Sequence, residues 1–198
     1  PNSIAALVAS ALAHFDSHFA PYLPCFQSRT RSVGDAARLY LHGLFQCHRR
    51  NLEKMAETVS GSQYQRLHHM LSESAWDRRG VRQQLIADAN AHFGHASALV
   101  IDESAFAKKG DMSAGVARQW NGRLGKTDNS QVGVFAAVVR DRVAALVEGE
   151  LYVPEEWFAD AARCQEAGLP EGLAFCTKGE MALRMIHRLR REGLHFAH

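Results

Sequence analysis

The sequence contains no closely spaced cysteine pair and no apolar run long enough to cross a membrane. Its four cysteines, Cys25, Cys47, Cys164 and Cys176, lie far apart, and no C-x-x-C motif occurs. This spacing argues against a zinc ribbon and against a redox motif, so we expect reduced thiols in a cytoplasmic protein. Charged residues interrupt every apolar run before the roughly 20 residues that a membrane span requires. No signal-peptide pattern opens the chain, so we expect neither secretion nor membrane insertion.

What the chain does contain is a globular composition with segregated charge. Its 198 residues are 46% hydrophobic, which is enough to bury a core. The formal net charge is only +2, but residues 141–177 hold eight acidic side chains against two arginines, so that block carries −6 and the remainder +8. A basic majority fits a surface that binds a polyanion, and ordinary solvated surface charge is the alternative.

Apolar residues before Gly94 recur at helical spacing. Ser32 and Asp35 have the spacing of a capping box at the start of one helix, and Gly94 is placed to close the last helix in a left-handed conformation. The expected helical faces are Ala5, Val8, Leu12 and Phe15; Ala37, Leu41 and Leu44; Leu67, Met70 and Leu71; and Val81, Leu85 and Ala89.

The change of pattern near Gly94 predicts two domains. Residues 1–94 are expected to form a helical bundle whose one loop contains Pro21, Pro24 and residues 28–32. Residues 95–198 are expected to form a mixed domain of strands and helices.

Three runs after Gly94 have the length and composition of strands. They cover 98–101, 131–139 and 143–153, with a tight connection at 140–142 between the last two. A turn and helix start follow at 154–156.

The C-terminal part of the chain is expected to hold one more helix and the start of a strand. Thr177 and Glu180 form a capping box before a helix containing Ala182, Met185, Ile186 and Leu189, and residues 194–197 begin a further strand. A three-stranded antiparallel meander, a helix and a returning strand are the opening of a ribonuclease H-like fold, so the predicted class is α+β.

Asp102 is the first candidate functional residue. It follows Leu99, Val100 and Ile101 at the end of an expected buried strand. A carboxylate is rarely buried without a partner, and a metal ion is one such partner. A strand-end cap or an ion pair is the alternative. Glu103 alternates to the other face of the strand, so it is assigned no metal role.

A basic, glycine-rich segment follows Asp102. Glycines beside cationic side chains allow close backbone approach to phosphate, although each charge alone could be an ordinary loop residue. Trp120 could stack on a base or pin the loop to the core, and the packing role is slightly favoured. The candidate DNA-binding residues are Lys108, Lys109, Arg118, Trp120, Arg123 and Lys126.

Histidine and arginine clusters elsewhere are assigned simpler roles. His68, His69, His92 and His95 are expected at surface or capping positions, because no carboxylate or cysteine set completes a zinc site. Two arginine groups are expected on solvated helix faces, with contact to a DNA backbone as the alternative. These groups are Arg78, Arg79 and Arg82, and Arg184, Arg188 and Arg191.

Three stretches combine residues in a characteristic way. The first contains Val100-Ile101-Asp102-Glu103-Ser104, Phe106, Lys108-Lys109-Gly110, Ser113-Ala114-Gly115-Val116-Ala117-Arg118-Gln119-Trp120, Gly122, Gly125-Lys126, Asp128-Asn129 and Gln131-Val132-Gly133-Val134-Phe135. The others are Leu151-Tyr152-Val153-Pro154-Glu155-Glu156-Trp157 and Lys178-Gly179-Glu180-Met181-Ala182-Leu183. As a set they resemble the DDE transposases of bacterial insertion sequences.

The resemblance implies DNA cutting and strand transfer by two Asp and one Glu that hold two divalent ions, Mg²⁺ or Mn²⁺. Asp102 matches the first carboxylate. The implied partners are element-end DNA, bound by the helical domain, target DNA and further copies of the chain. The implied location is the bacterial cytoplasm, at the nucleoid.

The chain departs from this pattern because the second Asp and the Glu would lie beyond His198. We therefore expect a fragment, the first half of a ribonuclease H-like domain, that cannot cut or join DNA by itself. A truncated or repurposed remnant that only binds DNA or oligomerises is the alternative. The strand of Asp102 should expose an unpaired edge that invites pairing with another chain.

Overall fold

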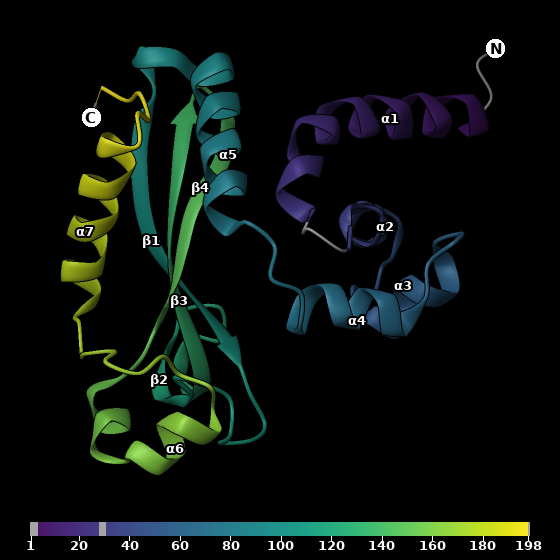
Figure 1. Cartoon of the computed structure of the whole chain (residues 1–198). Helices are drawn as coiled ribbons and strands as arrows, with labels where there is room; N and C mark the ends of the chain where they lie inside the picture. Colours follow the sequence, from purple (N-terminus) through teal and green to yellow (C-terminus); the bar gives the residue numbers. More distant parts are fainter. Residues whose placement is uncertain (1–3, 28–30, 198) are drawn as a thin grey trace. The chain divides into compact units, whose positions relative to one another are not determined.

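The computed structural model describes residues 4–27 and 31–197, and the chain divides into two compact units, Pro1–Gln84 and Leu85–His198. The first unit is helical and the second is built around a sheet (Figure 1). The helix that includes the boundary, α5, contributes its first turns to the first unit and the rest to the second.

The first unit is a cluster of short helices. Its core is made by Leu39, Met55, Val59 and Leu67, which are all buried. Each predicted helix is present, but α3 was not predicted because it is only seven residues long and buries only Met55. The elements are α1 (Ile4–Phe19), η1 (Ala20–Phe26), α2 (Gly34–Gln46), α3 (Leu52–Thr58), α4 (Tyr64–Ser72) and α5 (Arg78–Phe93).

Two local predictions in this unit need correction. Pro21 and Pro24 lie in the 3₁₀ helix η1 and not in a loop, while residues 28–30 of that predicted loop lie outside the described residues. The capping box at Ser32 and Asp35 is wrong, because α2 begins one position later, with Val33 at the N-cap and no side-chain cap. Asp35 instead pairs with Arg38 and Arg66.

The second unit contains an open, four-stranded antiparallel sheet. The long central strand β3 pairs with β1 along one edge and with β2 and β4 along the other. The β3–β4 turn falls at the predicted position, where Asp141 takes a positive φ of 56°. The strands are β1 (Ala98–Ala107), β2 (Ala117–Asn121), β3 (Lys126–Arg140) and β4 (Val143–Tyr152).

β2 was missed in the sequence because neither it nor the part of β3 that it pairs with alternates apolar and polar residues. Buried side-chain hydrogen bonds hold it instead. The Asn121 amide donates to Ser130 Oγ over 3.0 Å, and the Gln119 amide donates to the Ser130 carbonyl over 3.0 Å.

Two helices cover one face of the sheet. Ile86, Ala89 and Phe93 of α5 and Met185 and Leu189 of α7 pack against buried residues of β3 and β4. α7 spans Lys178–Arg191 and begins with the predicted capping box. We name this side of the sheet the packed face; it carries Leu99, Ile101, Val134, Ala136 and Val138.

A smaller cluster lies beside β2 (Figure 1). It joins Val116 and Val153 to Trp157, which lies on η3 (Glu155–Ala159), and Cys164 of α6 (Ala161–Glu166) packs against it. The Trp157 indole N–H donates to the Val116 carbonyl over 2.8 Å, and the Arg163 guanidinium lies 3.8 Å from the ring centroid.

Residues 194–197 do not form the predicted strand. After Gly193, which has a φ of 89°, the Leu194 amide donates back to the Leu189 carbonyl and ends α7. The Ala197 amide then donates to the Ser97 carbonyl, directly before β1. The segment therefore runs beside the start of β1 with a single backbone hydrogen bond.

The combination of helices with an antiparallel sheet confirms the α+β class. The four cysteines are free thiols, as expected. None of the helices in the described part of the chain is long and apolar enough to cross a membrane.

Candidate functional site

Asp102 lies in the middle of β1, not at its end. The prediction of a strand that stops at Ile101 is wrong because the pairing of β1 with β3 continues as far as Ala107 and Ser130. Asp102 is exposed, and its Oδ1 accepts a hydrogen bond from the Glu103 amide over 2.8 Å. Its carboxylate therefore needs no buried partner.

The strand register places Asp102 on the side of the sheet opposite the packed face. Directly paired residues of antiparallel strands share a face, and Asp102 pairs with Phe135. Arg118 pairs with Asn129, and Trp120 pairs with Thr127. Asn129 and Thr127 lie an even number of positions from Phe135 along β3, so all of these side chains share one face. We name this side the open face; it carries Val100, Asp102, Phe106, Arg118, Trp120 and Phe135.

The open face is largely accessible. Val100 is 47% exposed, Phe106 44% and Trp120 58%. Glu103, in contrast, lies on the packed side, where it pairs with Lys178 of α7. The alternation predicted for Asp102 and Glu103 is therefore confirmed.

Two glycines shape the open face beside Asp102. A Cβ added at Gly133 would lie 2.7 Å from the Phe135 ring, and one added at Gly149 would lie 2.9 Å from it. The ring therefore lies low over both glycine backbones and meets Phe106 edge-on, with the ring centroids 6.4 Å apart. This arrangement places two aromatic rings, nearly perpendicular to each other, on the open face.

The predicted basic residues lie on β2, at the start of β3, and in the loops that follow β1 and β2. Asn129 anchors the loop after β1, because its amide donates to the Lys108 and Gly110 carbonyls. Lys109 is exposed in that loop, and Arg123 is exposed in the β2–β3 turn.

Lys126 differs from the other candidates because it forms an ion pair with Asp128 over 2.9 Å. The Lys126 ammonium group donates a hydrogen bond to the Asp128 carboxylate. This bond, followed by the one from the Asn129 amide, lowers the pKa of Asp128 below its ordinary value. The Lys126 ammonium group thus already has a carboxylate partner within the protein.

The prediction that Trp120 pins the loop to the core is wrong. Trp120 is the most exposed tryptophan, whereas Trp157 is fully buried and performs the packing role. The structural role of Trp157 was missed, although its neighbours Pro154 and Glu155 signalled a helix start.

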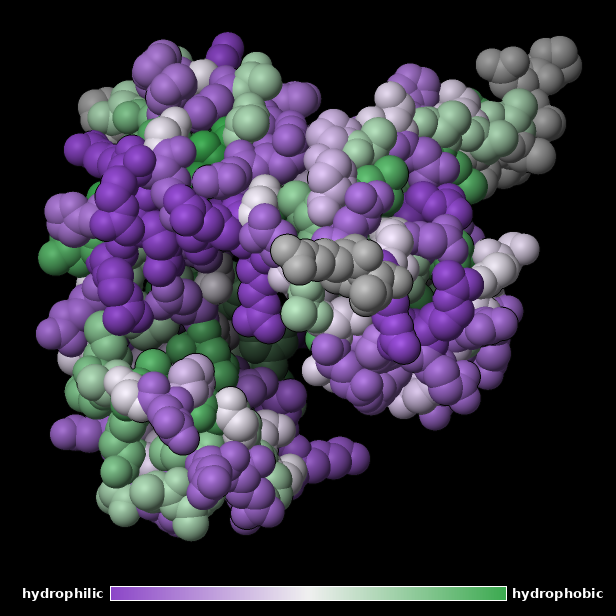
Figure 2. All heavy atoms as spheres, in the orientation of Figure 1, coloured by the Kyte–Doolittle hydropathy of each residue, from purple (hydrophilic) through white to green (hydrophobic). Residues whose placement is uncertain are grey.

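The arginines of α7 are not a freely solvated face. Arg188 binds Glu148 over 3.0 Å and also Glu150, and Arg184 binds Glu150 over 2.8 Å. Burial disfavours ionisation of Glu150, but the hydrogen bonds and charges of Arg188 and Arg184 outweigh it, so the pKa of Glu150 lies below its ordinary value. Figure 2 shows the strongly hydrophilic residues gathered over α7.

The histidines take local roles. His69 pairs with Glu73 over 3.0 Å, His68 meets Ser72, and His92 Nδ1 lies 3.0 Å from the Asp88 carbonyl. No group of three or more His, Cys, Asp or Glu side chains among residues 4–27 and 31–197 could hold a metal ion.

Asp102 is therefore a single candidate ligand. An exposed carboxylate suits a hard cation such as Mg²⁺, but a two-metal centre needs more oxygen ligands than this one residue supplies. The described residues do not by themselves fit such a centre. What they offer is one accessible carboxylate on the same face as two aromatic rings, with cationic side chains further along the same sheet.

Comparisons with known proteins agree on one family. A family model described as DDE superfamily endonuclease matches residues 21–198. The chain is 34% identical over 151 residues to a probable transposase for insertion sequence element IS701 from Microchaete diplosiphon. That match covers 75% of this chain and 36% of the relative, so the chain spans only about a third of the relative's length. No solved structure gives a significant match. The chain therefore belongs to the DDE superfamily endonucleases.

Proposed function

We propose that this chain is the DNA-binding and first catalytic part of an insertion-sequence transposase, in which Asp102 is the first carboxylate of the metal centre. One observation carries the proposal: Asp102 is accessible on the open face, and Arg118 and Trp120 project from the same side of the sheet. A DNA strand on this face would meet the carboxylate, a phosphate-binding cation and a stacking surface together.

The proposed DNA surface extends from the open face onto the adjoining loops. Lys108, Lys109 and Arg123 lie in or next to these loops, while Lys126 is held by Asp128. The helical residues 1–94 would bind the element ends. Binding to chromosomal DNA would keep the chain at the nucleoid of the bacterial cytoplasm, and target DNA would bind to the same surface.

The sheet supports a ribonuclease H-like arrangement in part. β1, β3 and β4 form the antiparallel meander expected for the first half of that fold, and α7 follows them. β2 is an addition within the loop between the first two strands of the meander.

Endonucleases of this superfamily generally use divalent metal ions. Mg²⁺ or Mn²⁺ suits a carboxylate oxygen ligand. Because Asp102 alone supplies too few ligands for two ions, we expect this chain by itself to bind a metal weakly and not to cut or join DNA.

A metal titration tests the role of Asp102 without requiring activity. Mn²⁺ added to the isotopically labelled chain should broaden the amide signals around Asp102 and Phe135, more strongly with a DNA oligonucleotide present. Asp102→Asn should abolish this broadening, whereas Asp141→Asn, which changes an exposed carboxylate in the β3–β4 turn, should not. Equal broadening in the Asp102 variant would contradict the assignment.

DNA binding is tested separately by gel shift at low salt with element-end and random duplexes. Preference for element ends supports specific recognition, and equal retention indicates charge attraction alone. If neither DNA is retained, the DNA-binding proposal is wrong.

One observation favours the alternative of an oligomerising, catalytically inactive module. Within the described part of the chain, β1 pairs along one edge with β3, and no strand pairs with its other edge. Such an edge can pair with a second copy. Sedimentation of the chain across a concentration range would show a dimer, and a monomer at all concentrations would contradict this alternative.

A further inference from the structure

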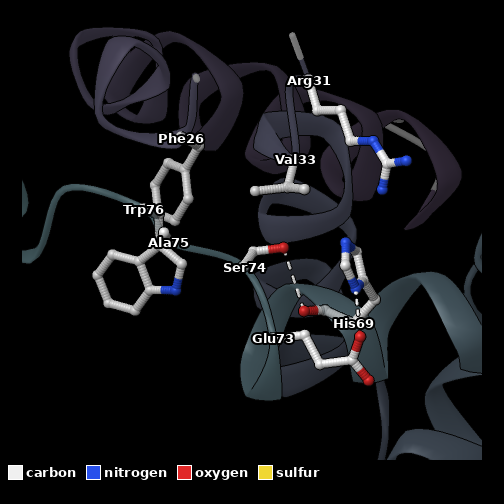
Figure 3. A pocket seen from close by; sticks show the side chains of 8 residues that line it. All are labelled: Phe26, Arg31, Val33, His69, Glu73, Ser74, Ala75 and Trp76. Atoms are coloured by element: carbon white, nitrogen blue, oxygen red, sulfur yellow. Dashed lines mark hydrogen bonds and ion pairs between the residues drawn. The ribbon is translucent and has the colours of Figure 1, made fainter. Parts of the chain in front are cut away.

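The first unit contains a cavity of about 220 Å³ that the proposed DNA surface does not use (Figure 3). It lies between the end of η1, the residues before α2 and the segment that follows α4. We infer that this cavity receives one unstacked nucleotide of bound DNA, an inference that rests on the proposed DNA-binding function.

One wall of the cavity is aromatic. Phe26 and Trp76 lie with ring centroids 5.4 Å apart and an interplanar angle of 33°. Phe26 is buried, whereas Trp76 is only half-buried. Part of the indole is therefore accessible to a ligand and held in place by a buried ring. Any of the four nucleobases can stack on such a surface, because every base has a π-face.

The opposite wall is polar. Figure 3 shows His69 and Glu73 across the cavity from the two rings, joined by the 3.0 Å contact between Nδ1 and Oε2. A fixed imidazole and carboxylate present donor and acceptor atoms, which match the mixed donors and acceptors on the edge of a base. Ser74 Oγ is already committed to the His69 carbonyl over 3.1 Å.

One cationic group lines the cavity and another lies near its aromatic wall. Arg31 is exposed on the side of His69, and the Arg78 guanidinium is 5.7 Å from the Trp76 ring centroid. Residues 1–84 contain ten Lys and Arg against six Asp and Glu. This excess charge attracts an anionic polymer, and a guanidinium beside a stacking surface is suited to the phosphate of the stacked nucleotide.

The size of the cavity limits the ligand. Its volume lies below the roughly 300–1,000 Å³ of sites for drug-sized ligands, so it holds one ring system. A base within a duplex exposes neither face, so the nucleotide must be unpaired or turned out of the stack.

The experiment compares two duplexes that differ by one nucleotide. One is fully paired, and the other carries a single unpaired 2-aminopurine, whose fluorescence falls when it stacks on an aromatic ring. The full chain should bind the bulged duplex roughly tenfold more tightly, in line with the stacking of one base. Binding should quench the fluorescence.

Three variants localise the effect. Trp76→Leu should abolish both the preference and the quenching, and its circular dichroism spectrum must match that of the wild type. Arg31→Gln, at an exposed position, should weaken binding of the bulged duplex severalfold, and its circular dichroism spectrum must also match that of the wild type. Phe45→Leu, which changes a 73%-exposed aromatic residue outside the cavity, should retain the full preference.

Each outcome decides between the inferences. Equal binding of both duplexes, without quenching, would overturn the nucleotide site and leave DNA binding intact. Retention of neither duplex at low salt would overturn both. A dimer of the chain that Trp76→Leu dissociates would show that the cavity takes a side chain of a second copy, and would also overturn the nucleotide site.

Discussion

Asp102 and Phe135 are directly paired residues of β1 and β3, so their side chains leave the sheet on the same open face. The Phe135 ring is turned over the neighbouring Gly133 and Gly149, and the Asp102 side chain remains exposed. The candidate carboxylate thus lies on the same face as the Phe135 ring and is accessible to solvent.

Replacing Gly133 with a residue that has a side chain should lower the free energy of unfolding. Gly133→Ala places a methyl group 2.7 Å from the Phe135 ring and forces it to move, which should lower the free energy of unfolding by about 1–3 kcal/mol. In a Phe135→Ala background the same change should cost much less. Urea unfolding of the four proteins of this double-mutant cycle gives the coupling, and additive effects would contradict the contact.

The arginine–glutamate cluster on α7 and β4 should contribute to stability. Arg188→Met leaves Glu148 without its 3.0 Å partner and removes one partner of Glu150, so the free energy of unfolding should fall by about 1–3 kcal/mol. Arg191→Met, an exposed change on the same helix, is the control and should have little effect. Urea unfolding at neutral pH measures both.

The same cluster predicts a dependence on pH. The folded pKa of Glu150 lies below its ordinary value, which is about 4.3 in an unfolded chain. Between these values the unfolded chain binds more protons, so the contribution is complete above the ordinary pKa and is lost as the pH falls through the folded pKa. Glu150→Gln should flatten the fall in stability below about pH 4.3. An unchanged slope would show that other carboxyl groups cause it.

The cations of the proposed DNA surface should contribute unequally. Lys109→Gln should weaken DNA binding and reduce the slope of log K against log salt by about 0.9, the value for one phosphate contact. Lys126→Gln should change the slope less, because Asp128 already holds that ammonium group. Fluorescence anisotropy at several salt concentrations distinguishes the two, and an equal loss would contradict the role of the ion pair.

Trp157 should matter for stability and not for direct contact with DNA. Trp157→Phe removes the donor to the Val116 carbonyl in a buried cluster, so the free energy of unfolding should fall by about 1–3 kcal/mol. Trp120→Phe, at an exposed position, should leave stability nearly unchanged. Thermal unfolding of the two variants tests this contrast.

Local features were predictable where neighbouring residues alone determine the structure. The capping box of Thr177 and Glu180, the left-handed Gly94 and the turn at 140–142 all occur as expected. Each depends mainly on hydrogen bonds or backbone angles within a few residues. The predicted box at Ser32 and Asp35 did not form, and Asp35 pairs with Arg38 and with the distant Arg66 instead. The short elements α3, α6 and β2 were missed because their apolar patterns are weak.

The candidate site was only partly predictable. The residue types around Asp102 identified the family, which the comparisons confirm. Its place in the middle of a strand, and the ion pairs of Arg184 and Arg188, depend on partners that lie in other strands.

The primary structure was thus sufficient for the family, the main helices, the β3–β4 hairpin and the two alternating faces of β1, because periodicity and short motifs encode them. The folded chain was needed to show that the face carrying Asp102 is open, that Phe135 lies over two glycines on it, and that Trp157 rather than Trp120 is buried. These properties arise from strand register and from contacts between residues far apart in the chain, which local composition does not specify. The pairing of β1 with β3 therefore decides which face of the sheet carries Asp102.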